Sequence, residues 1–259
     1  MKIATWNVNS LRVRLPHVLD WLERHQPDFL ALQEIKMMDD ECPVDALRTA
    51  GYHTLVSGQK TYNGVAILSR EAAEGDVNDV IRDLPGFDDP ARRVLAANYG
   101  ALRVINLYVP NGQRVDSDKY TYKLDWLEHA TAWLKEELQR RENVLVVGDF
   151  NIAPEPRDVY DPELWKGRVL FSEPERAAFR GLLELGLADT FRLFQQEEGS
   201  FSWWDYRMGA FRRNRGLRID HILASPALTE RCTASGIDTK PRRLERPSDH
   251  APVVAEFRV

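Results

Sequence analysis

The chain has 259 residues, of which 43% are hydrophobic and 29% charged, and its formal net charge is −5. This length is sufficient for one domain with a large buried core, and the balanced composition excludes a disordered or low-complexity chain. No stretch approaches the roughly 20 apolar residues of a membrane span, and the amino terminus lacks the apolar segment of a signal peptide. The two cysteines, Cys42 and Cys232, fit no metal-ligand spacing. We therefore expect a cytoplasmic protein that makes no contact with membranes.

Short apolar runs and amphipathic stretches alternate from the start of the chain. Residues 3–8 and 29–32 are short and apolar enough to be buried strands. Between them, leucine and valine recur at helical spacing, with Asn9 or Ser10 placed to cap the helix. The four strands expected next are residues 52–56, 65–69, 94–99 and 102–109, the last two joined as a hairpin through Gly100 and Ala101.

The second half of the chain contains the clearest helix. Over residues 119–141 apolar side chains recur every three or four positions, which is typical of a helix with one buried face. That face is predicted to consist of Leu124, Leu127, Thr131, Leu134 and Leu138.

Four further elements complete the chain. Residues 144–147, 218–224 and 251–259 are predicted as strands, and residues 176–187 as a helix. Strands and helices interleaved without a linker indicate a single α/β domain over residues 1–259. The hairpin-like pairs favour mixed sheets over purely parallel ones.

Polar side chains stand repeatedly where a predicted apolar strand ends. A rigid scaffold places functional groups at such strand ends and in the loops beside them. Taken singly, each carboxylate is typical of a helix cap or a turn, and each asparagine or histidine of a local hydrogen bond. Their recurrence at six strand edges favours one shared site. The set consists of Asn7, Glu34, Tyr108, Asp149, Asn151, Asp220, Asp249 and His250.

These residue types suit phosphoester hydrolysis better than acyl transfer. Carboxylate and amide oxygens without thiolates are typical ligands of a hard cation such as Mg²⁺. A histidine beside an acid indicates a held tautomer and a stabilised imidazolium. An Asp-x-Asn pair is suited to orienting or deprotonating a water. The sequence has neither a Gly-x-Ser-x-Gly elbow nor a glycine loop that cradles phosphate.

Four sequence blocks contain most of these polar residues: WNVNSLR at 6–12, LQEIK at 32–36, GDFNIAP at 148–154 and PSDHAPV at 247–253. Through these blocks the chain resembles the endonuclease/exonuclease/phosphatase superfamily, and within it the exonuclease III family. The abasic-endonuclease branch is indicated by GQKTYNGVAI at 58–67, NLYVPNG at 106–112, SWWDYR at 202–207 and NRGLRIDH at 214–221. The likeness implies a four-layer α/β sandwich, with two mixed, mainly antiparallel sheets packed face to face and helices outside, as in deoxyribonuclease.

The resemblance also implies a Mg²⁺ site, in which Mn²⁺ is expected to substitute. Glu34 is expected to be the main ligand, with Asn7 and Asp249 close by. The other residues implied near the cation are Asp149, Asn151 and His250.

For catalysis, the resemblance implies that Asp220 holds His250 in a dyad at the scissile phosphate. Asp149 is expected to prepare the attacking water, helped by Asn151, and Tyr108 to bind or protonate the phosphate. Which of Asp149, His250 and Tyr108 moves the decisive proton stays open. The implied reaction is Mg²⁺-dependent cleavage of the DNA backbone 5′ to abasic sites, with 3′-exonuclease and 3′-phosphatase activity in base excision repair.

The DNA-contacting surface is predicted from one arginine-rich segment. Residues 207–218 contain five arginines and no acid, between aromatic side chains, which suits phosphate, sugar and exposed-base contacts. The resemblance implies that this segment enters the helix and lines an abasic-sugar pocket. Arg242, Arg243 and Arg246 are consistent either with DNA contact or with plain surface charge. The expected contacts are Trp203, Trp204, Arg207, Arg212, Arg213, Arg215, Leu217 and Ile219 on this segment, and Tyr62, Asn63 and Gly64 on the other flank.

Three other functions remain open from the sequence. A superfamily phosphoesterase of lipids or inositols would lack a use for the arginine-rich segment. A DNA-binding module on a decayed enzyme would lack a ligand or dyad residue, and none is missing here. The third possibility is an enzyme of the same family that mainly processes 3′ ends and cleaves abasic sites poorly. Residues 165–172, with Leu170 and Phe171, could either obstruct or admit the extrahelical sugar, so the sequence leaves this balance open. The expected partner is double-stranded DNA with abasic sites or blocked 3′ ends, bound by a monomer.

Overall fold

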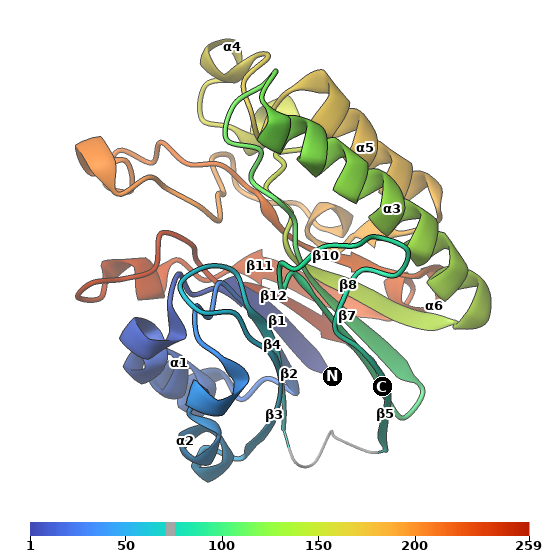
Figure 1. Ribbon diagram of the computed structural model, residues 1–259. Coiled ribbons are helices and arrows are strands. Elements are labelled where there is room, and N and C mark those ends of the chain that lie inside the picture. The colour runs from blue at the N-terminus through green and yellow to red at the C-terminus, as the bar shows by residue number, and fades with distance from the viewer. Residues whose placement is uncertain (71–75, 259) are drawn as a thin grey trace.

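The computed structural model describes residues 1–70 and 76–258, and residue 259 of the last predicted strand lies outside this range (Figure 1). The helices are α1 (Leu11–His25), α2 (Val44–Thr49), α3 (Asp118–Arg140), α4 (Pro162–Trp165), α5 (Glu173–Glu184) and α6 (Pro226–Thr229). The strands are β1 (Lys2–Asn7), β2 (Phe29–Gln33), β3 (Tyr52–Ser57), β4 (Val65–Arg70), β5 (Val77–Ile81), β6 (Val94–Tyr99), β7 (Leu102–Tyr108), β8 (Asn143–Asp149), β9 (Ala188–Asp189), β10 (Asp220–Ala224), β11 (Cys232–Ile237) and β12 (Val253–Phe257).

The strands form two six-stranded mixed sheets. The first has the order β11-β12-β1-β2-β4-β3 and the second β5-β6-β7-β8-β10-β9. One neighbouring pair in each sheet is parallel, β1 with β2 and β7 with β8, and the remaining pairs are antiparallel. The predicted hairpin between β6 and β7 is confirmed, with Gly100 at φ +59° in its turn.

The two sheets pack face to face and helices cover both outer faces. Ile3 and Ile67 of the first sheet meet Leu145 and Ile222 of the second in one apolar cluster. α1 lies on the outer face of the first sheet, and α3 and α5 lie on the outer face of the second (Figure 1). The fold is therefore the predicted four-layer α/β sandwich. Among the described residues, none of the helices combines the length and apolarity that a membrane crossing requires.

The predicted side-chain cap at Ser10 is wrong. Ser10 stands at the start of α1 but makes no side-chain cap; its φ is +93° and its backbone N–H donates to the carbonyl oxygen of Glu34. The predicted inner stripe of α3 is confirmed in part. Leu127 and Leu134 are buried, and Leu124 and Leu138 are half-buried against the same core, whereas Lys123 and Glu137 of this helix are buried charged residues that the stripe did not include.

A candidate catalytic site between the sheet edges

The inward-facing rows of both sheets end in polar side chains at one edge of the core. Side chains alternate along a strand, so Ile3, Thr5 and Asn7 of β1 share the face that points to the other sheet. The same parity puts Asp149 of β8 on the inner face, two positions after Val147. Four more inner-facing residues reach this edge by the same rule: Gln33, Asn106, Tyr108 and Asp220.

A buried pair of amides links the two sheets beneath the site. Gln33 donates through Nε2 to Oγ1 of Thr5 at 2.8 Å and to Oδ1 of Asn106 at 2.7 Å. Asn106 in turn donates to the carbonyl oxygens of Leu32 and Ala66, each at 2.9 Å. Sequence reasoning did not assign Gln33 or Asn106, although both are polar residues inside apolar strands. Their hydrogen bonds fix the spacing of the sheet edges that carry the catalytic candidates.

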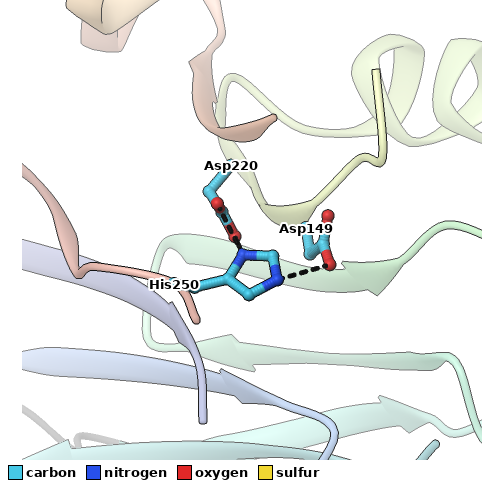
Figure 2. Close-up of side chains that lie close together, drawn as sticks. All are labelled: Asp149, Asp220 and His250. Atoms are coloured by element: carbon cyan, nitrogen blue, oxygen red, sulfur yellow. Dashed lines mark hydrogen bonds and ion pairs between the residues drawn. The ribbon is translucent and has the colours of Figure 1, made fainter. Parts of the chain in front are cut away.

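His250 lies between two buried carboxylates (Figure 2). Its Nδ1 is 2.9 Å from Oδ2 of Asp220, and its Nε2 is 3.7 Å from Oδ2 of Asp149. The hydroxyl of Ser202 donates to Oδ2 of Asp220 at 2.6 Å. Asp220 therefore holds the imidazole by Nδ1 and leaves Nε2 directed toward Asp149. The structure brings together the predicted dyad and the predicted water-activating acid.

The electrostatics of this trio favour a protonated histidine. Burial alone lowers the pKa of His250, but the negative charges of Asp220 and Asp149 outweigh it and raise the pKa to about 10. At neutral pH the ring is an imidazolium, which can donate through Nε2 to an anionic oxygen.

The surroundings of Asp149 raise the pKa of its carboxyl group. Burial raises its pKa to about 7, with further upward contributions from the nearby Asp220 and Glu34 carboxylates, although the charge of His250 acts downward. A carboxyl group with a pKa near neutrality is suited to accept a proton during the reaction and release it afterwards.

A second group of side chains surrounds Glu34. Nδ2 of Asn7 donates to Oε1 of Glu34 and to Oδ2 of Asp149, both at 2.9 Å. The Tyr108 hydroxyl donates to Oε1 of Glu34 at 2.8 Å, and Nζ of Lys36 lies 2.8 Å from Oε2. Burial acts to raise the pKa of Glu34, but Lys36 and Asn7 outweigh it and lower the pKa. Glu34 is therefore ionised and ready to bind a cation.

Tyr108 remains a phenol at physiological pH. Burial and the charges of Glu34 and Asp149 raise its pKa well above the ordinary value. A phenol that keeps its proton serves as a hydrogen-bond donor to an anionic oxygen.

The donor set around Glu34 fits a hard divalent cation. Oxygens of Glu34 and Asp149 converge on the one amide nitrogen of Asn7, which is the arrangement a small cation between two carboxylates requires. Asp149, Asp220 and His250 also bring ligand atoms within 4.8 Å of one another. Because Asp220 and His250 already satisfy each other through Nδ1, the carboxylate oxygens that remain to face a cation are those of Glu34 and Asp149.

Asp249 faces away from this group. Its Oδ1 accepts from Nδ2 of Asn9 at 2.9 Å, and its Oδ2 accepts from Nε1 of Trp203 at 3.0 Å. Burial acts to raise the pKa of Asp249, but His250 and Trp203 outweigh it and lower the pKa. Asp249 therefore links Asn9, in the first loop of the chain, to Trp203, which precedes the arginine-rich segment.

Asn151 is held by the loop that follows β7. Its Oδ1 accepts from Nδ2 of Asn111 at 3.0 Å, and its Nδ2 donates to the carbonyl oxygen of Val109 at 3.1 Å. The backbone N–H of Asn151 donates to Oδ1 of Asp149 at 2.9 Å. The predicted role beside Asp149 is thus consistent with its position, since Asn151 orients the Asp149 carboxylate through its backbone.

The arginine-rich segment presents an exposed basic surface next to the site. Arg212, Arg213 and Arg215 are exposed, and Arg207 is exposed but paired with Asp205, with Nη2 at 2.6 Å from Oδ2. Trp203, which precedes this segment in the chain, is joined to His250 by a β-bridge, so the segment follows a residue that is anchored at the catalytic cluster.

Three of the residues predicted to contact DNA are buried in the structure. Trp204 is 1% exposed, packs edge-on against Phe211 and donates to Oδ1 of Asn214. Leu217 and Ile219 are 0% and 1% exposed and pack in an apolar cluster with Leu170 and Phe171. These three side chains therefore present almost no surface to a ligand in this conformation.

Arg242 is also buried and makes no DNA-facing surface. Its guanidinium lies 5.0 Å from the ring centroid of Phe211 and 5.8 Å from that of Trp204, and donates to the carbonyl oxygens of Trp204 and Ser248. Arg242 therefore attaches the arginine-rich segment to the turn that carries Asp249 and His250. The sequence alone does not distinguish this buried role of Arg242 from that of an ordinary surface arginine.

The opposite flank of the site carries a prominent tyrosine. Tyr62 is 68% exposed, and Asn63 adopts φ +54° beside the buried Gly64. Together with Tyr108 and Asn111, Tyr62 and Asn63 line a cavity of about 570 Å³. The catalytic cluster therefore lies between this aromatic flank and the arginine-rich segment.

Comparisons with known proteins agree with this geometry. A family model described as the Endonuclease/Exonuclease/phosphatase family matches residues 4–250. Exodeoxyribonuclease III of Haemophilus influenzae is 39% identical over 275 aligned positions, covering 100% of both chains. The structure of the 3′ phosphatase NExo from Neisseria, bound to a product DNA hairpin, is 48% identical with a TM-score of 0.96. An AP endonuclease from Archaeoglobus fulgidus is 42% identical with a TM-score of 0.94, and each structure is matched over 100% of both chains.

Proposed function

Because the chain belongs to the endonuclease/exonuclease/phosphatase family, and to its exodeoxyribonuclease III group, it is a hydrolase of DNA phosphoester bonds, and we propose that it cleaves DNA 5′ to abasic sites and clears blocked 3′ ends. The observation that carries the proposal is the buried Asp220–His250–Asp149 cluster, bridged through His250 to Trp203, after which the chain carries a series of exposed arginines. The relatives include an AP endonuclease and a 3′ phosphatase. We further propose that the protein acts as a monomer in the cytoplasm.

In the proposed mechanism, water attacks phosphorus in line with the departing O3′. Asp149 accepts the proton of that water, since its pKa of about 7 lets it be a base at neutral pH. The His250 imidazolium, fixed by Asp220, donates from Nε2 to a phosphoryl oxygen and offsets its growing negative charge. Tyr108 donates its phenol proton in a hydrogen bond to the same phosphate.

The reaction uses a divalent cation, which we propose to be Mg²⁺, with Mn²⁺ able to replace it. When bound, it acts as a Lewis acid on the phosphoryl oxygens and the leaving group. Glu34 and Asp149 would hold it with their carboxylate oxygens, and Asn7 would contribute its amide oxygen after a flip of the side chain. Asp249 and His250 would lie near the cation but are not among the residues proposed to hold it.

The proposal is tested with two DNA duplexes. One carries an internal abasic site and the other a nick with a 3′-phosphate, and each is incubated with and without Mg²⁺. We expect product from both duplexes with Mg²⁺ and none after chelation. Failure to cut either duplex while a small phosphate ester is hydrolysed would reject DNA repair in favour of a lipid or inositol phosphoesterase.

A second candidate keeps the site and changes the main substrate. Leu170 and Phe171 pack against Leu217 and Ile219, so an extrahelical sugar would have to enter next to a closed apolar wall. This favours an enzyme that mainly processes 3′ ends, and the Neisseria relative is a 3′ phosphatase. The rate ratio between the two duplexes decides between the candidates.

Replacing Glu34 with glutamine is expected to raise the Mg²⁺ concentration needed for half-maximal cleavage by about ten-fold or more, since one charged oxygen ligand is lost. The measurement is a Mg²⁺ titration of the initial rate at fixed duplex concentration. Glu41→Gln is the control, because Glu41 is an exposed acid that binds Arg12 on the surface. An unchanged titration midpoint in Glu34→Gln would show that Glu34 is not a ligand of the cation.

Replacing Arg212 and Arg213 with alanine is expected to lower DNA affinity and to reduce the slope of log affinity against log salt by about 1 to 2. Both arginines are exposed and lie on the segment that follows Trp203. Binding is measured by fluorescence anisotropy at several salt concentrations. Alanine at Arg12 and Arg24 of α1 provides a matched loss of two exposed charges. An identical salt slope in both double variants would show that Arg212 and Arg213 do not contact the DNA.

A further inference from the structure

A completely buried ion pair lies behind three loops that border the catalytic site. Lys123 of α3 and Glu175 of α5 have 0% side-chain exposure, and Nζ of Lys123 is 2.5 Å from Oε1 of Glu175. Burying two charges is costly unless geometry and additional hydrogen bonds compensate. Each further bond that this pair makes goes to one of the three loops.

Lys123 holds the two loops that follow β7 and β8. Beyond Glu175, its ammonium donates to the carbonyl oxygen of Asn151 at 2.7 Å and to that of Asn111 at 3.2 Å. An ammonium has three protons, so all three have acceptors. The side chains of Asn111 and Asn151 bond to each other as well, and the backbone of Asn151 orients Asp149. The position of Lys123 is therefore transmitted to Asp149 through one residue.

Glu175 holds the third loop, residues 168–172. Its Oε1 accepts from the backbone N–H of Leu170 at 3.0 Å, and its Oε2 accepts from the N–H and the hydroxyl of Ser172 at 3.0 and 2.5 Å. The carbonyl oxygen of Leu170 accepts from the N–H of Ala153, two positions after Asn151. The second and third loops are thus joined directly and through the ion pair.

The conformation of Leu170 shows that this loop is held against its own preference. Leu170 has φ +75°, a left-handed conformation that is unfavourable for a residue other than glycine. Such residues persist where their surroundings determine the backbone. Here Glu175 binds the N–H and Ala153 binds the carbonyl. The side chain is thereby placed in the apolar wall with Phe171 and Leu217.

We propose that Lys123 and Glu175 are positioning residues that set the spacing between Asp149 and the apolar wall at Leu170 and Phe171, and so govern the ratio of internal abasic cleavage to 3′-end processing. The inference rests on the proposed function. Cleavage at an abasic site requires a sugar to fit between the catalytic cluster and this wall. Removal of a 3′-phosphate requires a phosphate at the cluster alone, so it depends less on where the wall stands.

The test is the double variant Lys123→Met/Glu175→Leu. Apolar replacement of a buried ion pair is often tolerated, but here it also leaves N–H and carbonyl groups of the three loops without these partners. The melting temperature is therefore expected to fall while the loops lose their fixed spacing, and rates are measured well below it. We expect kcat for the abasic duplex to fall at least about ten-fold, because displacements of about 1 Å near the reacting groups have effects of this size or larger. We expect kcat for the 3′-phosphate nick to fall less than about three-fold, because Asn151 keeps its bonds to Asn111, Val109 and Asp149 and so holds the cluster while the wall moves. KM for both duplexes should stay nearly unchanged, since the arginines predicted to contact DNA are untouched.

Two further variants make the result decisive. Lys123→Met/Glu175→Gln keeps an uncharged acceptor for Leu170 and is expected to restore part of the lost abasic activity; it also serves as the test should the leucine variant fail to fold. Arg103→Met/Glu137→Leu removes the other buried pair of α3, at 2.8 Å and at the far end of β7 from Tyr108, and is expected to leave the ratio unchanged.

Equal losses on the two duplexes, or no loss on either, would overturn the inference. The same holds if the Arg103 and Glu137 variant shifted the ratio equally, because the effect would then belong to general packing. A wild-type protein that cuts neither duplex would instead reject the proposed function, so the two failures are distinct.

Discussion

Replacing Asp149 with asparagine is expected to lower kcat on the abasic duplex by about 100- to 10,000-fold, the range measured for loss of a general base. Asp149 is buried between Nε2 of His250 and the amide of Asn7, and its pKa of about 7 suits a group that takes up one proton in each turnover. Asparagine preserves the size of the side chain but cannot accept the proton. Single-turnover rates report this chemical step directly.

The pH profile gives the same assignment an independent check. If Asp149 is needed as a carboxylate, activity rises as pH increases through its pKa, and in the wild type this acid limb lies near pH 7 or below. A divalent cation stabilises the carboxylate, so the limb is expected to move to lower pH as Mg²⁺ increases. In Asp149→Asn this limb should disappear.

Controls separate loss of chemistry from loss of binding. Asp40→Asn removes one exposed carboxylate outside the site and should leave kcat unchanged. DNA affinity of Asp149→Asn, measured by anisotropy without Mg²⁺, should equal or exceed that of the wild type, since a negative charge near the phosphate is gone. Full turnover by Asp149→Asn would transfer the base role to another residue.

Much of the fold could be predicted from local pattern because its central strands are short apolar runs, buried along most of their length. β6 coincides with the predicted 94–99, and β1, β2 and β7 differ from prediction by one residue at their ends. β11 and β5 were missed because their residues are only partly buried and carry polar side chains, as in Thr233 and Asp79. Edge strands of this kind lack the apolar run that identifies a central strand.

The set of site residues followed from strand ends and family motifs, but their partners did not. Sequence placed Asp149, Asp220 and His250 at three strand edges far apart in the chain, and the pairing of β8 with β10 then sets Asp149 opposite Asp220. Register between distant strands is a tertiary property that no local pattern encodes. For the same reason the burial of Trp204 could not be predicted, since exposed and buried tryptophans look alike in a sequence.

Charged residues in the core were the main source of error. Lys123 and Glu137 on α3 and Arg218 beside β10 read as surface residues, yet each is buried in an ion pair: Lys123 with Glu175, Glu137 with Arg103, and Arg218 with Asp158. Charged side chains enter a core when a partner and hydrogen bonds are supplied from elsewhere in the chain. Those partners lie 34 to 60 positions away in the sequence.

Replacing Asp220 with asparagine is expected to reduce kcat/KM by about 100-fold or more at pH 7.5, and to reduce it further as pH rises. The negative charge of Asp220 is the largest factor that raises the pKa of His250 to about 10, against the lowering effect of burial. Without that charge, the pKa of His250 falls, and the imidazolium is lost at a lower pH.

Loss of the Asp220 charge is expected to shift the alkaline limb of the pH profile to lower pH. In the wild type the alkaline limb, where activity falls as His250 loses its proton, should lie near pH 10. In Asp220→Asn the limb should move toward neutrality, so the ratio of wild-type to variant rates grows between about pH 7 and 9. The measurement is kcat/KM from pH 6 to 10 at constant ionic strength, with melting temperature recorded at each pH.

Ser202→Ala is the matched control for this shift, because Ser202 donates to Asp220 at 2.6 Å without carrying charge. It removes a hydrogen bond from the dyad and leaves the carboxylate beside Nδ1, so a smaller rate loss with an alkaline limb close to that of the wild type is expected. If Asp220→Asn kept its alkaline limb near pH 10, the proton lost there would not be that of His250, and another donor such as Tyr108 would have to neutralise the phosphoryl oxygen.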